Sequence, residues 1–318
     1  MHPTRGRADI LTRVTRRGSL FVALLAVATS TTAQSVRLTL AIVRPDGHLV
    51  PFAAYDNGRW ARAWPAADEL TDDEPTFENI PSVWRRRGVA IPRTWQVWPT
   101  SGAQPIQARV KDVAIVDAHC GAQVALKTDL PSVKTDHPRK FGVAVDPNHP
   151  VAAIEAVPQS DDAWKSAERV IAGRLADLEG QRARADGVQL PAETPVPAAR
   201  IIELYRESRS ARSPLYFVAE KPYRTARARW DPQCAAKTLM TGWLLRANDR
   251  LILRAPRIFL TDCDAKEART AWPLGVLHLA GQSFWILQEH GYEDETYVVA
   301  EVGRASIGYP LTVNGGGC

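Results

Sequence analysis

Two Asx-Gly dipeptides near the N-terminus constrain the fold more than any other feature of the chain. Asp46-Gly47 and Asn57-Gly58 separate short apolar stretches within residues 36–64. Asn and Asp followed by Gly readily adopt the left-handed backbone angles of a two-residue turn, so this dipeptide between apolar runs is the strongest short-range signal for a β-hairpin. Residues 36–64 are therefore expected to form an antiparallel meander of three strands.

The C-terminal part of the chain repeats this pattern. Short apolar runs alternate there with turn signals, and the middle of the chain adds further strand-like runs. We therefore expect a mainly β protein with one principal α-helix (α+β), with antiparallel meanders at both ends and a sandwich- or barrel-like arrangement. The expected strands lie within residues 110–128, 140–146, 274–280, 283–290 and 296–302, with turns at Gly281-Gln282 and within residues 291–295.

One segment has helical rather than β periodicity. Within residues 161–185 the side chains of Trp164, Ala167, Ile171, Leu175 and Leu178 recur at the spacing of one helix face. Asp161 and Asp162 suit the helix start, where carboxylates meet free N–H groups. A Pro-rich stretch, residues 186–198, follows as a linker or exposed loop.

These boundaries divide the chain into four parts. They are a leader, an N-terminal β-rich region, the helix with its Pro-rich loop, and a C-terminal β-rich region: residues 1–33, 34–158, 159–198 and 199–318. The helix is a natural divide between two domains. In the alternative, the terminal meanders pair with each other and close a single body.

The leader has the layout of a secretory signal peptide. Five arginines precede an uncharged apolar run, Leu20–Ala28, and small polar residues follow it. The run is about half the length that spans a bilayer. We expect cleavage after Ala33 and a bacterial-type protein that is secreted or periplasmic, with no membrane contact beyond the signal peptide. An uncleaved anchor and twin-arginine export are the alternatives.

Removing the leader also removes most of the net positive charge. The leader holds five of the 40 Lys+Arg and one of the 35 Asp+Glu, which leaves a net charge of about +1. A nearly neutral chain has no electrostatic basis for binding nucleic acid or an anionic membrane. Neither partner is expected.

The four cysteines are interpreted as two disulfides, because all of them follow the leader and an oxidising compartment favours pairing. Asn248-Asp249 predicts a hairpin turn that places Ala247 opposite Arg250. If the same register continues along the hairpin, Cys234 lies opposite Cys263. Pro256 signals an edge strand or a bulge, and a bulge would shift that register. Cys120 and Cys318 remain as the second pair, with glycines 315–317 letting the tail reach its partner. The alternative is a frayed tail with a free thiol.

Tryptophan is abundant, with ten in the chain. Exposed indole rings can stack on sugars or grip partner surfaces, whereas buried rings fill the space between sheets. Trp95 and Trp98 are the candidate ligand-binding residues, with a glycan or a cell-envelope protein as the partner. Packing within the core is the alternative for each of them.

Catalytic motifs are absent from the sequence, which contains no G-x-S-x-G elbow, no H-E-x-x-H and no phosphate-binding glycine loop. The best polar cluster combines Asp117 and His119, which share a strand face, with Glu289 and His290. The leading hypothesis is a non-catalytic binding or structural module that needs no cofactor or metal. The alternative is an extracytoplasmic hydrolase that uses these four residues.

The leader generates the first testable prediction. Mass spectrometry of the exported protein should find Gln34 at or near its N-terminus, because Thr31 and Ala33 are the small residues that precede the cut. A full-length product that stays in the membrane would show that the leader is an uncleaved anchor.

The cysteines generate the second prediction. Non-reducing peptide mapping should find Cys120 linked to Cys318 and Cys234 linked to Cys263. Replacing Cys318 with Ser should lower the free energy of unfolding by about 2–5 kcal/mol, because the crosslink restricts a long loop of the unfolded chain. A Cys318 peptide that is alkylated as a free thiol contradicts the assignment.

Overall fold

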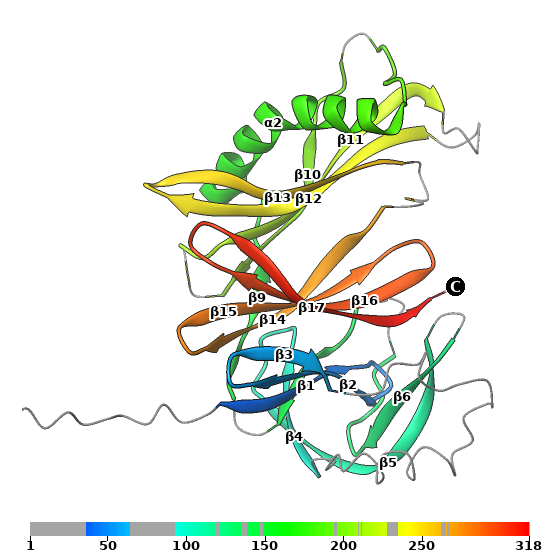
Figure 1. The fold of residues 1–318 in the computed structure, drawn as a ribbon, viewed down its shortest axis with the longest axis vertical. Coiled ribbons are helices and arrows are strands. Elements are labelled where there is room, and N and C mark those ends of the chain that lie inside the picture. The colour runs from blue at the N-terminus through cyan, green and yellow to red at the C-terminus, as the bar shows by residue number, and fades with distance from the viewer. Residues whose placement is uncertain are drawn as a thin grey trace, which may run out of the picture. The chain divides into compact units, whose positions relative to one another are not determined.

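A computed structural model describes most of the chain after the leader. The described residues are 36–63, 93–118, 121–134, 139–146, 149–193, 196–208, 210, 212–227, 235–261, 265 and 268–317. All four cysteines, His119 and the apolar run of the leader lie outside these ranges. The expectation of a mainly β chain with one principal helix, terminal meanders and a barrel- or sandwich-like arrangement is confirmed (Figure 1).

The N-terminal strands form a six-stranded antiparallel barrel. The barrel closes because β1, the first strand in the order of the sheet, also pairs with β2, the sixth. The seventh strand, β3, extends the sheet beyond β2. Around the barrel the strands are β1 (Arg37–Val43), β7 (Gly142–Asp146), β4 (Thr94–Pro99), β5 (Ile106–Ala118), β6 (Gly121–Thr128) and β2 (Leu49–Asp56), with β3 (Arg59–Arg62) outside.

Two five-stranded antiparallel sheets contain the other ten strands of the described residues. The first, which we call the central sheet, has the order β17 (Ile307–Gly317), β16 (Asp294–Val302), β15 (Gln282–His290), β14 (Thr270–Leu279) and β8 (Val151–Ala152). The second, the outer sheet, has the order β13 (Arg250–Thr261), β12 (Ala235–Ala247), β11 (Leu215–Arg227), β10 (Arg200–Glu207) and β9 (Ile154–Ala156).

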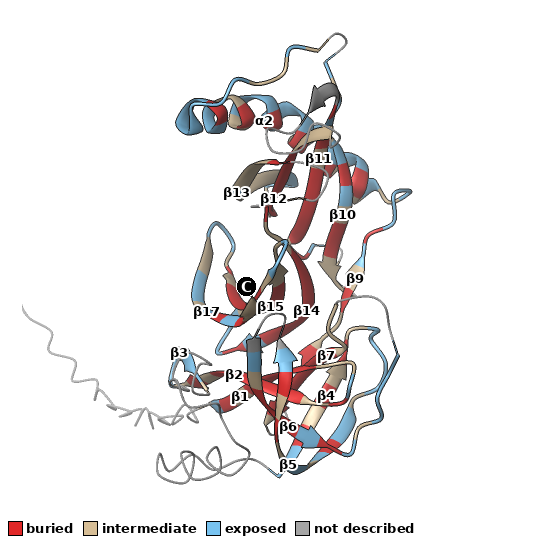
Figure 2. Cartoon of the chain, turned by 90° about the vertical axis from the view of Figure 1, so that its right-hand side faces the viewer, coloured by how far each residue is buried: buried red, intermediate tan, exposed pale blue. Residues whose placement is uncertain are grey.

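The buried side chains show how these elements stack. One face of the central sheet, including Phe284 and Ile286, packs on the outside of the barrel. Its other face, including Trp285 and Leu287, packs on the outer sheet. The far side of the outer sheet packs on the helix α2 (Asp162–Asp186). Figure 2 shows the resulting lines of buried residues along β11, β12, β14 and β15.

The local signals in the sequence explain these elements. Asn57 has φ of 49° and Asn248 and Asp249 have φ of 47° and 59°, as the hairpin turns require. The helix begins where expected, because the Asp161 side chain accepts a hydrogen bond from the Ala163 N–H at 2.8 Å. Both terminal meanders are present, and β17 adds a further strand to the second.

One predicted turn is displaced by one residue. The sequence placed the turn between β14 and β15 at Gly281-Gln282, whereas Ala280 and Gly281 form it, with φ of 50° and 79°. Ala280 adopts a left-handed conformation that is unusual for a residue with a Cβ atom. The shift changes which residues face each other across the hairpin, and His278 lies opposite Ser283.

The register between β12 and β13 also differs from the expectation. Ala247 does pair with Arg250, but the register shifts by one residue at a bulge, beyond which Thr241 faces Arg257. Gly242 permits this close approach, since a Cβ there would lie 3.2 Å from the Pro256 Cα. The inference that carried one unbroken register to Cys234 and Cys263 is therefore wrong, and their pairing stays a prediction without that support.

The C-terminal glycines are part of a strand rather than a tether. Gly315 and Gly316 belong to β17, where Gly316 pairs with Glu295 on β16. A Cβ on Gly315 would lie 3.0 Å from the Tyr297 Cζ, so the glycine lets the strand pack closely on the tyrosine ring. Cys318 follows directly after this strand and lies outside the described residues, so its link to Cys120 stays a prediction.

A buried polar cluster joins the helix to the outer sheet. Glu179 on α2 accepts hydrogen bonds from Lys221 Nζ at 2.6 Å, from Tyr223 Oη at 2.7 Å and from Thr238 Oγ1. The side chains of Glu179 and Lys221 are only 2% and 9% exposed. Burial and the Glu179 carboxylate raise the pKa of Tyr223, which therefore acts as a neutral donor.

Within the described residues, no helix is long and apolar enough to cross a membrane.

This cluster generates a prediction about stability. Replacing Lys221 with Met should lower the free energy of unfolding by about 3–5 kcal/mol, because it leaves a buried carboxylate without its cation. Arg182→Met is the matched control, since Arg182 pairs with Asp186 on the exposed side of the same helix. That variant should change stability by less than about 1 kcal/mol. Urea unfolding measures the free energy of unfolding of both variants. Equal losses would show that the buried ion pair contributes no more to stability than the exposed one.

Candidate functional site

One candidate site is a cavity of about 870 Å³ at one edge of the two sheets, next to the barrel. Its wall combines hydrocarbon surface with hydroxyl, amide and carboxylate groups. The apolar part consists of Trp98, Pro99, Pro105, Val151, Ile154 and Leu274. The polar part consists of Ser101, Gln104, Glu155, Glu207, Ser208 and Ser210.

Two chain segments build most of this wall. The first is the loop between β4 and β5, which begins with a turn in which the Gly102 N–H donates to the Pro99 carbonyl at 3.1 Å. The second runs through Ala153, between β8 in the central sheet and β9 in the outer sheet. The Ser208 N–H donates to the Ala153 carbonyl at 2.8 Å and so ties the end of β10 to that crossing. The cavity thus lies where one segment passes from sheet to sheet.

The two candidate tryptophans have different environments, because they point to opposite sides of β4. Trp95 is 1% exposed and packs inside the barrel with Val97 and Ala108, which is the environment expected of a core tryptophan. Trp98 is partly buried against the barrel and the central sheet and lines the cavity. Of the two residues, Trp98 is the one that lines the cavity.

The cavity carboxylates accept hydrogen bonds from nitrogen donors of Arg206 and His278. Glu155 accepts a hydrogen bond from Arg206 Nε at 2.5 Å, and the same guanidinium donates to Asp161 at 2.8 Å. The Ala163 N–H donor and Arg206 lower the pKa of Asp161 in spite of the opposing effect of burial. Glu207 accepts from His278 Nε2, at 2.9 Å. These contacts hold the carboxylate groups in fixed orientations at the cavity wall.

His278 links the cavity to a serine hydroxyl. Its Nδ1 lies 3.1 Å from Ser283 Oγ, and its Nε2 lies 2.9 Å from Glu207 Oε1. His278 and Ser283 are directly opposite each other on β14 and β15, while Glu207 reaches them from the end of β10. The His278 side chain is 52% exposed and that of Glu207 is 17% exposed. A carboxylate, an imidazole and a hydroxyl therefore form one hydrogen-bonded row at the rim of the cavity.

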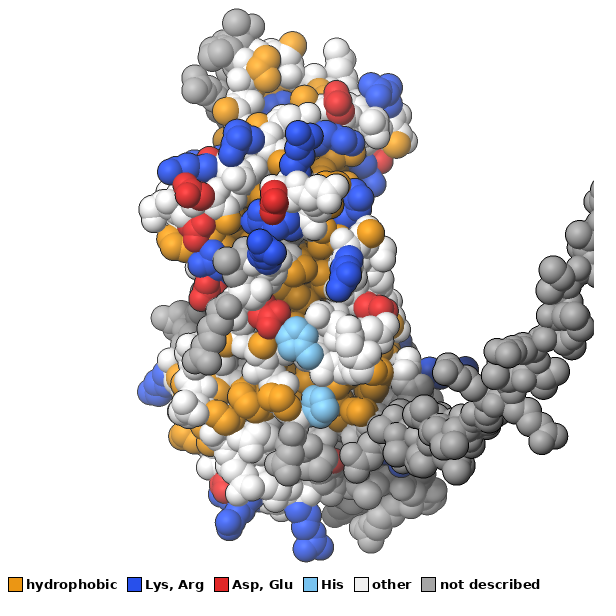
Figure 3. Space-filling model, turned by 90° about the vertical axis from the view of Figure 1, so that its left-hand side faces the viewer, with side chains coloured by type: hydrophobic (Ala, Val, Ile, Leu, Met, Phe, Trp, Pro, Cys, Tyr) orange, Lys and Arg blue, Asp and Glu red, His pale blue; other side chains and the backbone are white. Residues whose placement is uncertain are grey.

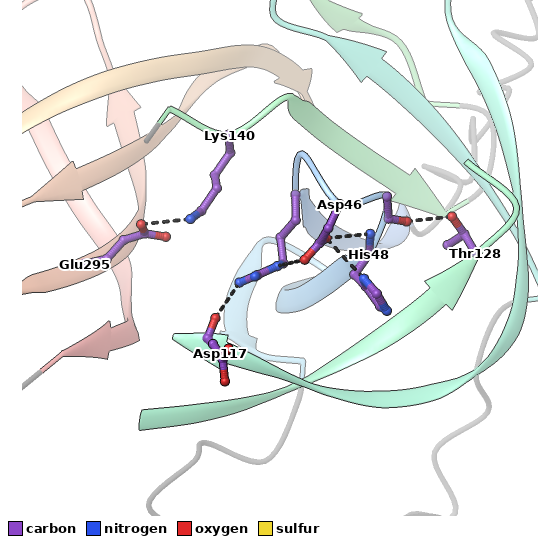
Figure 4. Close-up of polar contacts among 8 residues, drawn as sticks. Asp46, His48, Asp117, Thr128, Lys140 and Glu295 are labelled. Carbon is purple, nitrogen blue, oxygen red and sulfur yellow. Dashed lines mark hydrogen bonds and ion pairs between the residues drawn. The ribbon is translucent and has the colours of Figure 1, made fainter. Parts of the chain in front are cut away.

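The predicted catalytic candidates have other surroundings. Asp117 is exposed on β5, and its backbone carbonyl, rather than its carboxylate, accepts a hydrogen bond from Arg44 Nη1 at 2.9 Å (Figure 4). Its expected neighbour His119 lies outside the described residues. Glu289 accepts from Arg257 Nη1 at 2.6 Å, which joins the central sheet to the outer sheet.

His290 has a well-defined environment of its own. Its ring stacks on Trp272 with 3.6 Å between centroids, and its Nε2 lies 2.9 Å from Thr270 Oγ1. Both partners are on β14, so these contacts tie neighbouring strands of the central sheet together. These interactions of Glu289 and His290 join strands and sheets.

A second polar cluster joins the barrel to the central sheet. Lys140 Nζ lies 3.0 Å from Glu295 Oε2 (Figure 4). The Lys140 N–H donates to Gln288 Oε1 at 2.9 Å. Burial, together with the neighbouring Glu295 carboxylate, raises the pKa of Tyr297 well above its usual value. The charges of this cluster are balanced within the fold, so its role is structural.

The face that includes the outer sheet carries basic and apolar side chains together. Figure 3 shows lysine and arginine side chains gathered in the upper part of this face, where hydrophobic side chains also reach the surface. A shallow hollow of about 440 Å³ lies between α2 and β13, with Arg174 and Arg254 beside Leu251 and Leu253. Its lining residues include no carboxylate, hydroxyl or amide side chain. In this it differs from the cavity of about 870 Å³ that Trp98 lines, which we call the Trp98 cavity.

The sequence reasoning missed Glu207, His278 and Ser283. Glu207 and His278 are 71 residues apart, and only the packing of the two sheets brings them together. The contact between His278 and Ser283 follows from hairpin register, but the predicted turn at Gly281-Gln282 would place a different residue opposite His278. A turn assigned to Ala280-Gly281 is the signal that would have found this pair.

Comparison of the chain with protein-family models, with curated proteins and with solved structures found no match.

Proposed function

We propose that this protein is a secreted or periplasmic binding protein that holds a small, sugar-like ligand in the Trp98 cavity. The observation that carries the proposal is the composition of the cavity wall. Trp98 lines the cavity together with residues that carry hydroxyl, amide and carboxylate groups, around a space of about 870 Å³. Ligand sites of small molecules typically have volumes of about 300–1,000 Å³ and combine apolar walls with a few placed polar groups.

The chemistry of the wall favours a polyhydroxylated ligand. A sugar ring has an apolar face of C–H groups that packs on the face of an indole, and an edge of hydroxyl groups that both donate and accept hydrogen bonds. Ser101, Ser208 and Ser210 can do the same, and Gln104 adds an amide. A purely apolar ligand would leave these groups without partners, which costs free energy.

The compartment is supported by the leader, whose basic, apolar and small segments are typical of export. Two disulfides, which an oxidising compartment would maintain, are part of the same proposal.

A glycan array tests this proposal. The wild-type protein should bind at least one carbohydrate, and Trp98→Ala should weaken that binding by about fivefold or more, since an aromatic contact of this kind contributes about 1 kcal/mol. Tyr292→Ala is the matched control, because Tyr292 is an exposed aromatic residue in the turn before β16. It should bind as the wild type does.

A second variant separates ligand loss from misfolding. Ala103 is exposed on the loop between β4 and β5 and lines the cavity, so Ala103→Trp fills the cavity without disturbing a buried position. This variant should melt at the wild-type temperature and lose binding. Unchanged carbohydrate binding in both Trp98→Ala and Ala103→Trp, or an array without any bound glycan, contradicts the proposal.

A further inference from the structure

We propose that Glu207, His278 and Ser283 form a nucleophilic centre that cleaves carboxylic esters at the rim of the Trp98 cavity. Ser283 is the nucleophile, His278 is the general base and Glu207 is the positioning residue. The inference rests on the row of hydrogen bonds between the Glu207 carboxylate, the His278 ring and the Ser283 hydroxyl.

The carboxylate determines how the proton is arranged on the ring. An ionised carboxylate can only accept a hydrogen bond, so His278 Nε2 must carry the hydrogen in its contact with Glu207 at 2.9 Å. In the neutral imidazole, Nδ1 then has a free lone pair. The Ser283 hydroxyl, 3.1 Å away, donates its proton to that lone pair. This is the protonation state in which a histidine can activate a serine.

The same division of roles is found in serine hydrolases of unrelated folds, where the arrangement is recognised by geometry and roles rather than by sequence position. A hydroxyl is a weak nucleophile until an adjacent base removes its proton, and the base is effective only when a third group holds its orientation. Here the hairpin holds the histidine and the serine opposite each other, and the outer sheet supplies the carboxylate. The three elements are β strands packed in the core, which gives a rigid support.

The position of the row suits an incoming substrate. Half of the His278 side chain is exposed, and Ser283 is partly exposed at the end of its strand. Glu207 belongs both to the row and to the cavity wall. A ligand in the cavity therefore lies next to the row. If the cavity binds a sugar-like ligand, as the proposed function states, the substrate would be an O-acylated form of that ligand. The identity of the alcohol part rests on the proposed function, whereas the assignment of Ser283, His278 and Glu207 does not.

The reaction balances with water as the only co-reactant. Ser283 Oγ forms a bond to the ester carbonyl carbon while its proton passes to His278 Nδ1. The bond between that carbon and the alcohol oxygen then breaks, and the alcohol leaves with the proton from His278. Water next gives a proton to His278 and its oxygen attacks the acyl-serine carbonyl. The carboxylic acid leaves, and Ser283 regains its proton from His278.

Covalent labelling tests the nucleophile without any knowledge of the natural ester. The purified protein, incubated with a fluorophosphonate, should gain one adduct, and peptide mass spectrometry should place it on Ser283. Ser283→Ala should abolish the adduct. Ser306→Ala is the matched control, because Ser306 is an exposed serine in the turn between β16 and β17, and it should label as the wild type does.

The base is tested by rate. His278→Gln should lower the rate constants of labelling and of p-nitrophenyl acetate hydrolysis by about 100-fold or more, the usual contribution of a general base. His48→Gln is the control, since His48 contacts Asp46 in a barrel turn, and both rate constants should stay at the wild-type value. Circular dichroism confirms that each variant is folded.

The positioning role of Glu207 is tested by a measurement that a merely structural role would not change. Glu207→Gln should lower the labelling rate by about tenfold or more, because the amide can also donate and so permits the other ring tautomer. The ¹⁵N chemical shifts of the His278 ring should show the Nε2–H tautomer in the wild type and a mixture in the variant.

Three results would overturn the proposal: a folded wild-type protein with no adduct on Ser283, labelling that His278→Gln leaves unchanged, or a His278 ring that carries its proton on Nδ1. Fluorophosphonate and p-nitrophenyl acetate are too small to require the cavity, so Ala103→Trp should still label on Ser283. Adducts on Ser283 together with an empty glycan array would therefore support the nucleophilic centre and contradict only the proposed ligand.

Discussion

The burial of the central sheet on both faces is the constraint on which the rest of the structure depends. Phe284 and Ile286 face the barrel, while Trp285 and Leu287 face the outer sheet. Four consecutive apolar residues, 284–287, place hydrophobic side chains on both faces of β15, so the strand requires a packing partner on each side. The indole rings of Trp243 and Trp285 meet edge to face, with 5.0 Å between their centroids, at the centre of one of these interfaces.

Charged groups set the orientation of the layers that this apolar packing brings together. A buried charge is costly without a partner, so each such group is matched by one from the adjacent layer. Lys140 of the barrel pairs with Glu295, Arg257 of the outer sheet pairs with Glu289, and Lys221 of the outer sheet pairs with Glu179 of the helix. Apolar contacts tolerate sliding, whereas these pairs are satisfied in one arrangement only.

The cavity and the row at its rim are consequences of this layered arrangement. The chain leaves the central sheet at β8, passes through Ala153 and enters the outer sheet at β9, and the space beside that crossing is closed by Trp98 from the barrel. Glu207 ends the strand next to β9, which is why its carboxylate can reach His278 on the central sheet. A ligand site at a junction of layers is common, because side chains from several elements converge there without filling the space.

The sequence by itself determined the local elements of this protein. Asn57-Gly58 specified a hairpin through its backbone preferences, and Asp161 specified the helix start through its side chain, since both effects act within a few residues. Only the tertiary structure decided that Trp95 is enclosed while Trp98 lines a cavity. The alternation of side chains along β4 predicts that the two residues point to opposite sides of the strand, but it does not predict what covers each side. The bulge at Gly242 and the contact between Glu207 and His278 likewise depend on packing between segments far apart in the chain, whose geometry is set by the whole core.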